Sequence, residues 1–361
     1  FPEITEKEAH SIGVKVSNDS PKQSQLLESI PITVNGSLEG PDRDVYQIFG
    51  QKGQRIVLEV EARRLGSAID PVLRVLDSQL QQIFINDDTP SIGIDCRLDI
   101  SFPLDGSYYV VVHDARFSQQ DQNFYRLKIG TSSYAQGLFP LGWNRGEKTR
   151  VMLFGGSLAD SIEVDVDLTQ VPDQDDFIPI SLPGVLDSIP FNFVVGDLPE
   201  ILESPRSGVA TLQPSTVVNG LISEPSEIDQ YRLSVTPGEV WLITLDAAGL
   251  GTSRLAAVLT VFAEDGRRLT SSGDEVPDPD VFSLISPGRT SSDPFIPLVV
   301  PEDVESILIS VEDLADRGGP LYGYRLLAER QPLDFTLTLS TPYLNVPAGG
   351  TGSVSIVAHR R

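Results

Sequence analysis

The sequence predicts an all-β protein built from tandem β-sandwiches, and three observations support this prediction. Segments of five to eight residues alternate between apolar and polar side chains and are bounded by Gly, Pro, Asp and Asn, as in strands of a sandwich. The 27 Pro and 30 Gly residues leave little room for long helices. A set of motifs also occurs twice in the same order. With 361 residues, the chain is long enough for two to four domains.

The repeat defines the organisation of the chain. The Val-Asn-Gly segment at 34–36 recurs at 218–220, and the Asp-x-Tyr motif of Asp44 and Tyr46 recurs as Asp229 and Tyr231. In each copy a glycine turn follows and leads into alternating strands. Expected strands are at 55–60, 72–77, 108–112 and 124–127 in the first copy, and at 240–245, 257–262, 306–311 and 322–326 in the second. Because both copies keep this order and spacing, we interpret them as equivalent β-sandwiches.

A second pairing lies upstream of each copy. Residues 1–6 (Phe-Pro-Glu-Ile-Thr-Glu) resemble residues 198–203 (Leu-Pro-Glu-Ile-Leu-Glu), 197 positions later. The Val-Asn-Gly segments are 184 positions apart, so the first copy carries 13 additional residues between its upstream segment and its sandwich.

Two further units complete the predicted organisation. Residues 131–197 contain strand patterns at 148–154, 162–168 and 189–195, and they suit a small immunoglobulin-like sandwich. Strand patterns at 334–339 and 352–358 indicate the start of another such module, because two strands cannot bury their apolar faces alone. The predicted units are 1–14, a linker or the end of a preceding module; 15–130, the first sandwich; 131–197; 198–330, a linker and the second sandwich; and 331–361, a truncated module.

Composition limits which partners the chain can bind and indicates its cellular compartment. The net charge of −24 repels nucleic acid and anionic lipid and favours the binding of cations or basic partners. The alternative is that the acidic residues only form a solvated surface. No stretch approaches the roughly 20 apolar residues of a membrane helix, so we expect no membrane insertion. A single cysteine, Cys96, excludes an internal disulfide and favours a bacterial source. Since Phe1 is not a natural start, we expect a processed N-terminus and a longer parent protein.

These motifs resemble a known family. Asn18-Asp19-Ser20-Pro21, the Val-Asn-Gly segment at 34–36, Asp42 to Tyr46 and the Phe-Tyr-Arg-Leu strand at 124–127 resemble the bacterial pre-peptidase C-terminal domain. Residues 203–205, 218–220 and 229–231 make the second match. That family is a β-sandwich of secreted peptidases, including the collagen-binding domains of clostridial collagenases. The other modules look like the immunoglobulin-like modules that accompany it in planctomycete secreted and surface proteins. The resemblance implies an extracellular, cell-surface or periplasmic location.

The resemblance also implies a possible Ca²⁺ site in each copy, where an acidic linker meets the first strand. Ca²⁺ requires six to eight oxygen ligands. The positions that match the family's ligands are Asn18, Asp19, Asp42 and Asp44 in copy one, and Glu203, Glu227 and Asp229 in copy two. Both copies depart from the family pattern, because Val16 and Ser17 replace an expected glutamate and Arg206 replaces an asparagine. The alternative is that Asp44 and Asp229 cap turns through backbone amides.

Aromatic residues are the candidates for ligand binding. Tyr108, Tyr109, Phe124 and Tyr125 would form a binding face like that of the collagenase modules, or they pack in the core. Because side chains alternate along a strand, at most part of this set can be exposed. We expect Tyr46 and Tyr231 to pack inside their sandwiches with hydrogen-bonded hydroxyl groups.

The sequence gives little support for catalysis. It contains three histidines, His10, His113 and His359, and no Gly-x-Ser-x-Gly, Walker or zinc-ligand pattern. We therefore predict a non-catalytic accessory or adhesion region of a larger secreted or surface protein that binds polysaccharide, fibrous protein or envelope components. A structural stalk without a ligand, and a hydrolase with an unfamiliar site, are the alternatives.

Overall fold

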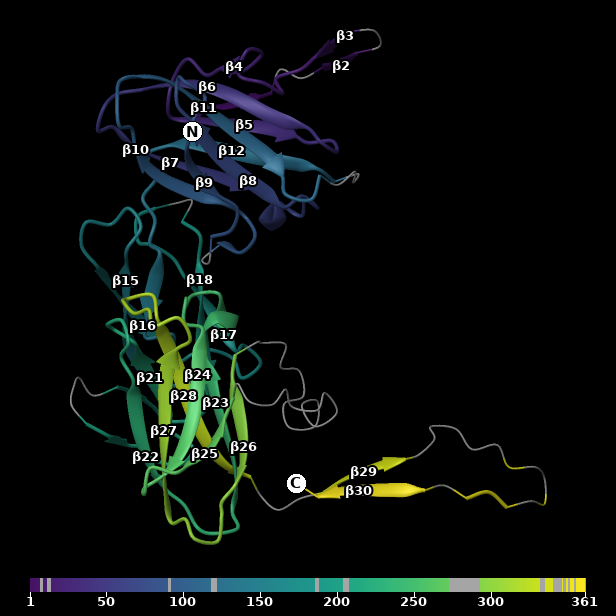
Figure 1. Cartoon of the computed structure of the whole chain (residues 1–361), viewed down its shortest axis with the longest axis vertical. Coiled ribbons are helices and arrows are strands. Elements are labelled where there is room, and N and C mark those ends of the chain that lie inside the picture. Colours follow the sequence, from purple (N-terminus) through teal and green to yellow (C-terminus); the bar gives the residue numbers. More distant parts are fainter. Residues whose placement is uncertain are drawn as a thin grey trace. The chain divides into compact units, whose positions relative to one another are not determined.

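The structure is a computed structural model. It describes residues 1–6, 9–11, 14–89, 92–117, 122–185, 188–203, 208–272, 293–331, 335–339, 346, 349, 351–353 and 355–360. This part of the chain is all-β, and its paired sheets form tandem β-sandwiches, so the predicted fold class is confirmed (Figure 1). No helix of the described residues is long and apolar enough to cross a membrane.

Sandwich 1 consists of two sheets that enclose one apolar core. The first has the order β1 (Glu3–Thr5), β5 (Ile32–Ser37), β12 (Phe124–Gly130), β7 (Arg55–Glu61), β10 (Arg97–Ser101). The second has the order β4 (Gln25–Leu26), β6 (Arg43–Gly50), β11 (Gly106–Asp114), β8 (Pro71–Leu76), β9 (Gln82–Asn86). A 3₁₀ turn, η1 (Arg63–Leu65), follows β7. Strand β11 lies between β6 and β8, as its apolar sequence predicts.

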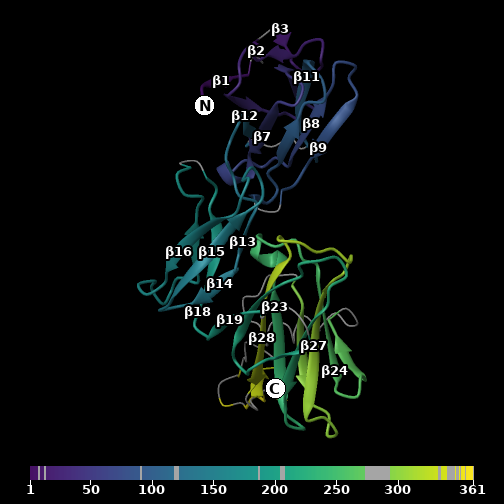
Figure 2. The same cartoon turned by 90° about the vertical axis from the view of Figure 1, so that its left-hand side faces the viewer.

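Sandwich 2 repeats this topology strand for strand. Its first sheet has the order β19 (Glu200–Leu202), β21 (Val217–Leu221), β28 (Gly323–Gln331), β23 (Val240–Asp246), β26 (Phe295–Val299). Its second has the order β20 (Ala210–Thr211), β22 (Asp229–Ser234), β27 (Ser306–Asp313), β24 (Ala257–Ala263), β25 (Arg268–Ser271). The turn η3 (Ala248–Leu250) corresponds to η1. Figure 2 shows β23 and β28 in one layer, facing β24 and β27 in the other.

The upstream segments belong to the sandwiches. Strand β1 pairs in parallel with β5, with Glu3 opposite Thr33, and β19 pairs in parallel with β21, with Glu200 opposite Val217. Strand β1, which lies in the stretch predicted as a linker or the end of a preceding module, is therefore an edge strand of sandwich 1. The hairpin of β2 (Ala9–Ser11) and β3 (Val14–Val16) lies within the additional residues of the first copy.

The residues between the sandwiches form two smaller sheets. One has the order β13 (Gly137–Phe139), β15 (Lys148–Phe154), β16 (Ile162–Asp167), and the other β14 (Gly142–Asn144), β18 (Phe191–Gly196), β17 (Phe177–Ile180). We call this region the middle module. Near the C-terminus, two strands are present as expected, and β29 (Phe335–Leu339) pairs antiparallel with β30 (Ile356–Arg360).

By its contacts the chain divides into two compact units, and the division passes through the middle module. Unit 1 comprises Phe1–Gly137, Leu153–Glu163 and Ile180–Phe191; unit 2 comprises Leu138–Met152, Val164–Pro179 and Asn192–Arg361. Each part of the middle module therefore groups with the sandwich that it contacts.

Candidate functional site

Four side chains meet inside sandwich 1 at the start of β6. Asp44 and Tyr46 are two residues apart on β6 and so point to the same face of their sheet. The Tyr125 hydroxyl, from β12, donates to Asp44 Oδ2 at 2.5 Å and lies 2.5 Å from the Tyr46 hydroxyl. Glu6, just after β1, completes the group. Asp44 and the two tyrosines are fully buried.

A glycine makes room for this cluster. Gly36 lies opposite Tyr125 in the β5–β12 ladder. A Cβ atom at Gly36 would lie 2.5 Å from Tyr125 Cζ and 2.7 Å from Glu6 Oε2. The repeated Val-Asn-Gly motif therefore requires glycine at this position, because the Tyr125 ring and the Glu6 carboxylate pack directly against its backbone.

The Glu6 carboxylate is anchored through one oxygen. Glu6 Oε1 accepts the Ser37 amide at 2.9 Å and the Ser37 hydroxyl at 3.1 Å. The other oxygen, Oε2, is buried without a hydrogen-bond partner, and so is Asp44 Oδ1. These two carboxyl groups lie close enough for a shared proton to bridge them.

Burial decides the charge of this pair. Burial, followed by the adjacent Glu6 charge, raises the pKa of Asp44 to about 10, and burial also raises the pKa of Glu6. Near neutral pH the pair therefore holds a proton unless a cation replaces it. Chemically, the arrangement can retain either a proton or a metal ion between two carboxyl groups.

Sandwich 2 contains the equivalent cluster. The Tyr324 hydroxyl donates to Asp229 Oδ2 at 2.6 Å and lies 2.6 Å from the Tyr231 hydroxyl. Glu203 Oε2 accepts the Leu221 amide at 3.0 Å, as Glu6 accepts that of its own partner strand. Burial, and then the Glu203 charge, raises the pKa of Asp229 to about 7, less than for Asp44. The second cluster thus holds its proton less tightly.

The residues predicted as ligands in copy one differ in burial and in their contacts. The Asn18 side chain is buried beside Tyr46, and neither its oxygen nor its nitrogen has a hydrogen-bond partner. Asp42 uses Oδ1 to accept the Arg43 amide at 2.9 Å. Asp19 is exposed. Asn18 and Asp44 therefore lie in the cluster, and Asp42 lies near enough for its charge to raise the pKa of Asp44, whereas Asp19 is exposed.

In copy two, Glu227 also serves a turn. Its Oε2 accepts the Ser223 amide at 2.5 Å, the Ser223 hydroxyl at 2.7 Å and the Glu224 amide at 2.9 Å. Glu203 and Asp229 come together, while Arg206 lies outside the described residues. Asp44 and Asp229 do not act as the expected turn caps, since each accepts a tyrosine hydroxyl.

Sequence reasoning missed Glu6. The family pattern places a glutamate directly before Asn18, whereas in the structure the glutamate of the cluster is twelve positions before Asn18, ahead of the β2–β3 hairpin. The signal was present, because Glu6 ends the upstream segment that matches the one ending in Glu203. The additional hairpin separates it from the rest of its site.

The carboxylates alone do not make a metal centre. Among the described residues, no three His, Cys, Asp or Glu side chains come together in a way that could hold a metal ion. In sandwich 1, however, Glu6, Asp44 and Asn18 place unpartnered buried oxygens in one cluster, which fits a hard cation. In sandwich 2, no such set of unpartnered oxygens occurs in the described cluster.

The four aromatic candidates do not form one face. Tyr108 and Tyr125 are in the core, 3% and 1% exposed, where they cannot contact a ligand. Tyr109 is half-buried on the outer side of β11, and Phe124 is exposed on β12. Since β11 and β12 belong to opposite sheets, these outward side chains lie on opposite sides of the sandwich. Tyr46 and Tyr231 are buried as expected.

The residues considered for catalysis are spread over the chain. His113 is buried at the end of β11, and burial lowers its pKa to about 4. Cys96 is fully buried, and burial raises its pKa well above the usual range of a thiol. The side chains of His10 and His359 lie outside the described residues.

No protein-family model matches the sequence, and no curated protein matches it either. The similar solved structures include the following three. The pre-peptidase C-terminal domain of a collagenase from Bacillus anthracis is 18% identical over 31% of this chain and 99% of its own, with a TM-score of 0.24. PliG from Aeromonas hydrophila, a periplasmic inhibitor of g-type lysozyme, is 19% identical over 30% of this chain and 94% of its own, with a TM-score of 0.25. The M60 catalytic domain with two CBM51 domains of Clostridium perfringens ZmpB is 13% identical over 82% of this chain and 34% of its own, with a TM-score of 0.20. At these values the similarity does not identify the family of this chain.

Proposed function

We propose that this chain is a non-catalytic accessory region of a larger secreted or cell-surface bacterial protein, in which docked β-modules space and attach other parts. The observation that carries the proposal is a buried ion pair beneath the contact between sandwich 2 and the middle module. Flexible linkers expose such groups to water, whereas a buried pair requires the two surfaces to remain packed.

The contact with sandwich 2 is centred on Arg325. Its guanidinium pairs with the Glu200 carboxylate, and the side chains are 7% and 0% exposed. Glu200 also accepts the Asn219 side-chain amide at 2.8 Å, and Asn219 Oδ1 accepts the Leu141 backbone amide of the middle module at 3.1 Å. A Cβ at Gly142 would lie 2.9 Å from Arg325 Nε. The backbone of the middle module therefore packs directly against side chains of sandwich 2.

Sandwich 1 makes a comparable contact in unit 1. The Tyr134 hydroxyl donates to Asp99 at 3.0 Å, and the Arg97 guanidinium lies 4.1 Å from the centre of the Tyr134 ring. Arg55 pairs with Asp99 at 2.5 Å and donates to the Gly156 carbonyl at 3.0 Å. Each sandwich thus has specific polar contacts with residues of the middle module.

Two matched variants test the spacer. Asn219→Ala removes the acceptor of the Leu141 amide, and Asn35→Ala changes the equivalent residue of sandwich 1, which has no such partner among the contacts described above. We expect faster hydrogen exchange at Leu141 in the first variant and unchanged exchange there in the second. Rapid exchange of Leu141 in the unaltered protein, or hydrolysis of substrates in a broad hydrolase screen, would contradict the proposal.

We also propose Ca²⁺ as a ligand of the sandwich 1 cluster, held by Glu6, Asp44 and Asn18 with further oxygens from carbonyl groups or water. The support is that buried oxygens of these residues lack partners. Bound Ca²⁺ would tie the segment after β1 to the sandwich and reduce its conformational freedom. Melting with Ca²⁺ against EGTA tests this. We expect a higher melting temperature with Ca²⁺ and no such shift in Asp44→Asn; an unchanged melting temperature in the unaltered protein would remove the proposal.

A further inference from the structure

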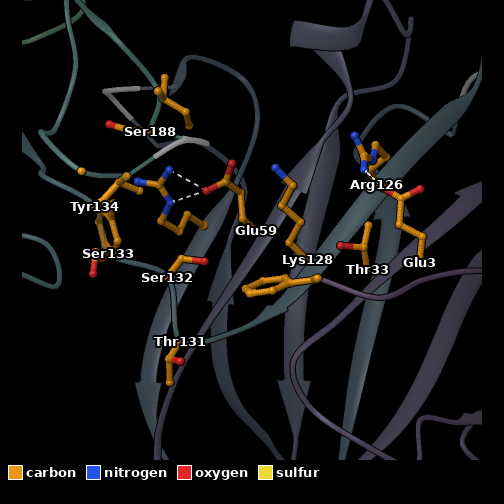
Figure 3. Close-up of a pocket in the computed structure, with 15 residues that line it drawn as sticks. Glu3, Thr33, Glu59, Arg126, Lys128, Thr131, Ser132, Ser133, Tyr134 and Ser188 are labelled. Atoms are coloured by element: carbon orange, nitrogen blue, oxygen red, sulfur yellow. Dashed lines mark hydrogen bonds and ion pairs between the residues drawn. The ribbon is translucent and has the colours of Figure 1, made fainter.

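Sandwich 1 has a groove of about 510 Å³ over its first sheet, within unit 1. Its floor is a row of side chains that runs across neighbouring strands, and residues 131–134 form one wall. The strand registers place Thr33 opposite Lys128, Lys128 opposite Glu59, and Glu59 opposite Arg97. Figure 3 shows Glu59 and Lys128 beside each other, with Tyr134 at one end and Arg126 with Glu3 at the other.

The equivalent row of sandwich 2 is different in chemistry. Val217 pairs with Leu327, Leu327 with Thr244, and Thr244 with Phe295. The polar residues Thr33, Lys128 and Arg97 thus correspond to Val, Leu and Phe. The polar row is therefore not required by the fold, because the same fold is built with apolar side chains at these positions.

The charges of the groove are balanced. Arg97 pairs with Glu59 at 2.5 Å, Lys128 pairs with Glu61 at 2.7 Å, and Arg126 pairs with Glu3. An anionic ligand would have to displace one of these carboxylates, and a cationic ligand one of the basic groups. The groove therefore favours a neutral ligand.

The groove nevertheless has many hydrogen-bonding groups. An ammonium group carries three donors, and one contact of Lys128 Nζ is the pair with Glu61. Arg126 Nε has no hydrogen-bond partner. Hydroxyl side chains also line the groove, at Thr33, Thr131, Ser132, Ser133 and Ser188. Hydroxyl groups both donate and accept, so this lining matches a ligand that is itself rich in hydroxyl groups.

From this groove we infer that sandwich 1 binds a neutral oligosaccharide chain, with Lys128 and the exposed Ser133 among its hydrogen-bonding residues. The inference rests on the proposed accessory function and gives it a ligand class. It adds a site that is distinct from the carboxyl–tyrosine cluster, which lies inside the sandwich.

Binding of soluble neutral hexasaccharides from cellulose, chitin, laminarin and mannan, measured by calorimetry on the full chain, tests the inference, with oligogalacturonate as an acidic comparison. We expect at least one neutral chain to bind more tightly than oligogalacturonate. The variant Lys128→Leu installs the residue of sandwich 2, Leu327, at this position, and loss of the lysine's hydrogen bonds should weaken binding by about tenfold.

The control is Lys148→Leu, which removes a lysine from an exposed ion pair with Asp167 outside the groove and should leave the affinity unchanged. Melting temperatures show whether each variant is folded, and protection of β7 and β12 amides on ligand addition gives a second readout in the unaltered chain. Absence of binding by all neutral chains, tighter binding of oligogalacturonate, or full affinity in Lys128→Leu would overturn the inference. The hydrogen-exchange result for Leu141 is independent of these outcomes, so failure here is distinguishable from failure of the spacer proposal.

Discussion

The two sandwiches contain the same ion pair in two environments. Glu3 and Arg126 occupy the positions that Glu200 and Arg325 occupy in the second copy, one on the parallel edge strand and one on its sheet. The first pair is 55% and 32% exposed, and the second is 0% and 7% exposed because the middle module covers it. The two copies thus share their topology and internal contacts. They differ in whether the outer face of the first sheet is covered at this ion pair.

The largest expected difference comes from removing the arginine of each pair. Arg325→Ala leaves the Glu200 carboxylate buried and unpaired, and should destabilise sandwich 2 by about 3–5 kcal/mol. Arg126→Ala leaves Glu3 in contact with water and should cost about 0–1 kcal/mol. Urea unfolding, with hydrogen exchange to locate the affected sandwich, measures both. Equal costs would show that the two faces are equally covered in solution.

The second comparison uses pH in a metal-free buffer. The folded pKa of Asp44 is about 10 and that of Asp229 about 7, both above the ordinary value of about 3.9. The contribution of such a group to the free energy of unfolding is present in full below its pKa in the unfolded chain. It is lost as the pH rises towards its pKa in the folded protein. Between pH 7 and 9, sandwich 1 therefore still loses stability through Asp44, by at most about 1.4 kcal/mol per pH unit. In sandwich 2 the loss through Asp229 has largely ended at these pH values.

Asp44→Asn should remove the pH dependence of the free energy of unfolding between pH 7 and 9. Asp229→Asn should remove it mainly between pH 4 and 7. Unfolding measured at a series of pH values, with EGTA present, tests the assignment. An identical slope in both sandwiches above pH 7 would contradict the difference between the two clusters.

The third comparison concerns a shared feature. Gly36→Ala and Gly220→Ala each place a methyl group against a buried tyrosine, and each should cost about 1–3 kcal/mol. Gly323→Ala is the control, because its Cβ would meet Phe139 at an ordinary 3.4 Å. Thermal unfolding measures the three variants. A large cost in one sandwich and none in the other would show that the clusters are not equivalent.

The smallest expected effect is that of Glu227→Ala. Because Glu227 holds a turn through the Ser223 and Glu224 amides, its removal should cost about 1 kcal/mol with or without Ca²⁺. Melting in Ca²⁺ and in EGTA separates this role from metal binding. If the variant loses a Ca²⁺-dependent stabilisation of sandwich 2, then Glu227 is a ligand.

Much of the fold could be predicted because its signals are local or repeated. Alternation predicted β7, β8, β11 and β12 and their equivalents to within a few residues, since it reflects which side of each strand faces the core. The repeat predicted two equivalent sandwiches. The candidate site was predicted less well: Asp44, Asn18, Glu203 and Asp229 reach the clusters, but Glu6 was missed because a hairpin separates it from them.

The sequence by itself determined that this protein is all-β, that it contains one sandwich twice, and that Tyr46 and Tyr231 lie inside. Only the tertiary structure decided which carboxylates meet, that Tyr109 and Phe124 lie on opposite sides, and that Glu200 with Arg325 is covered while Glu3 with Arg126 is not. The physical reason is that side-chain alternation and glycine turns act over a few residues. Burial of an outer face, and the charge of a carboxyl group on it, depend instead on which distant segment packs against it.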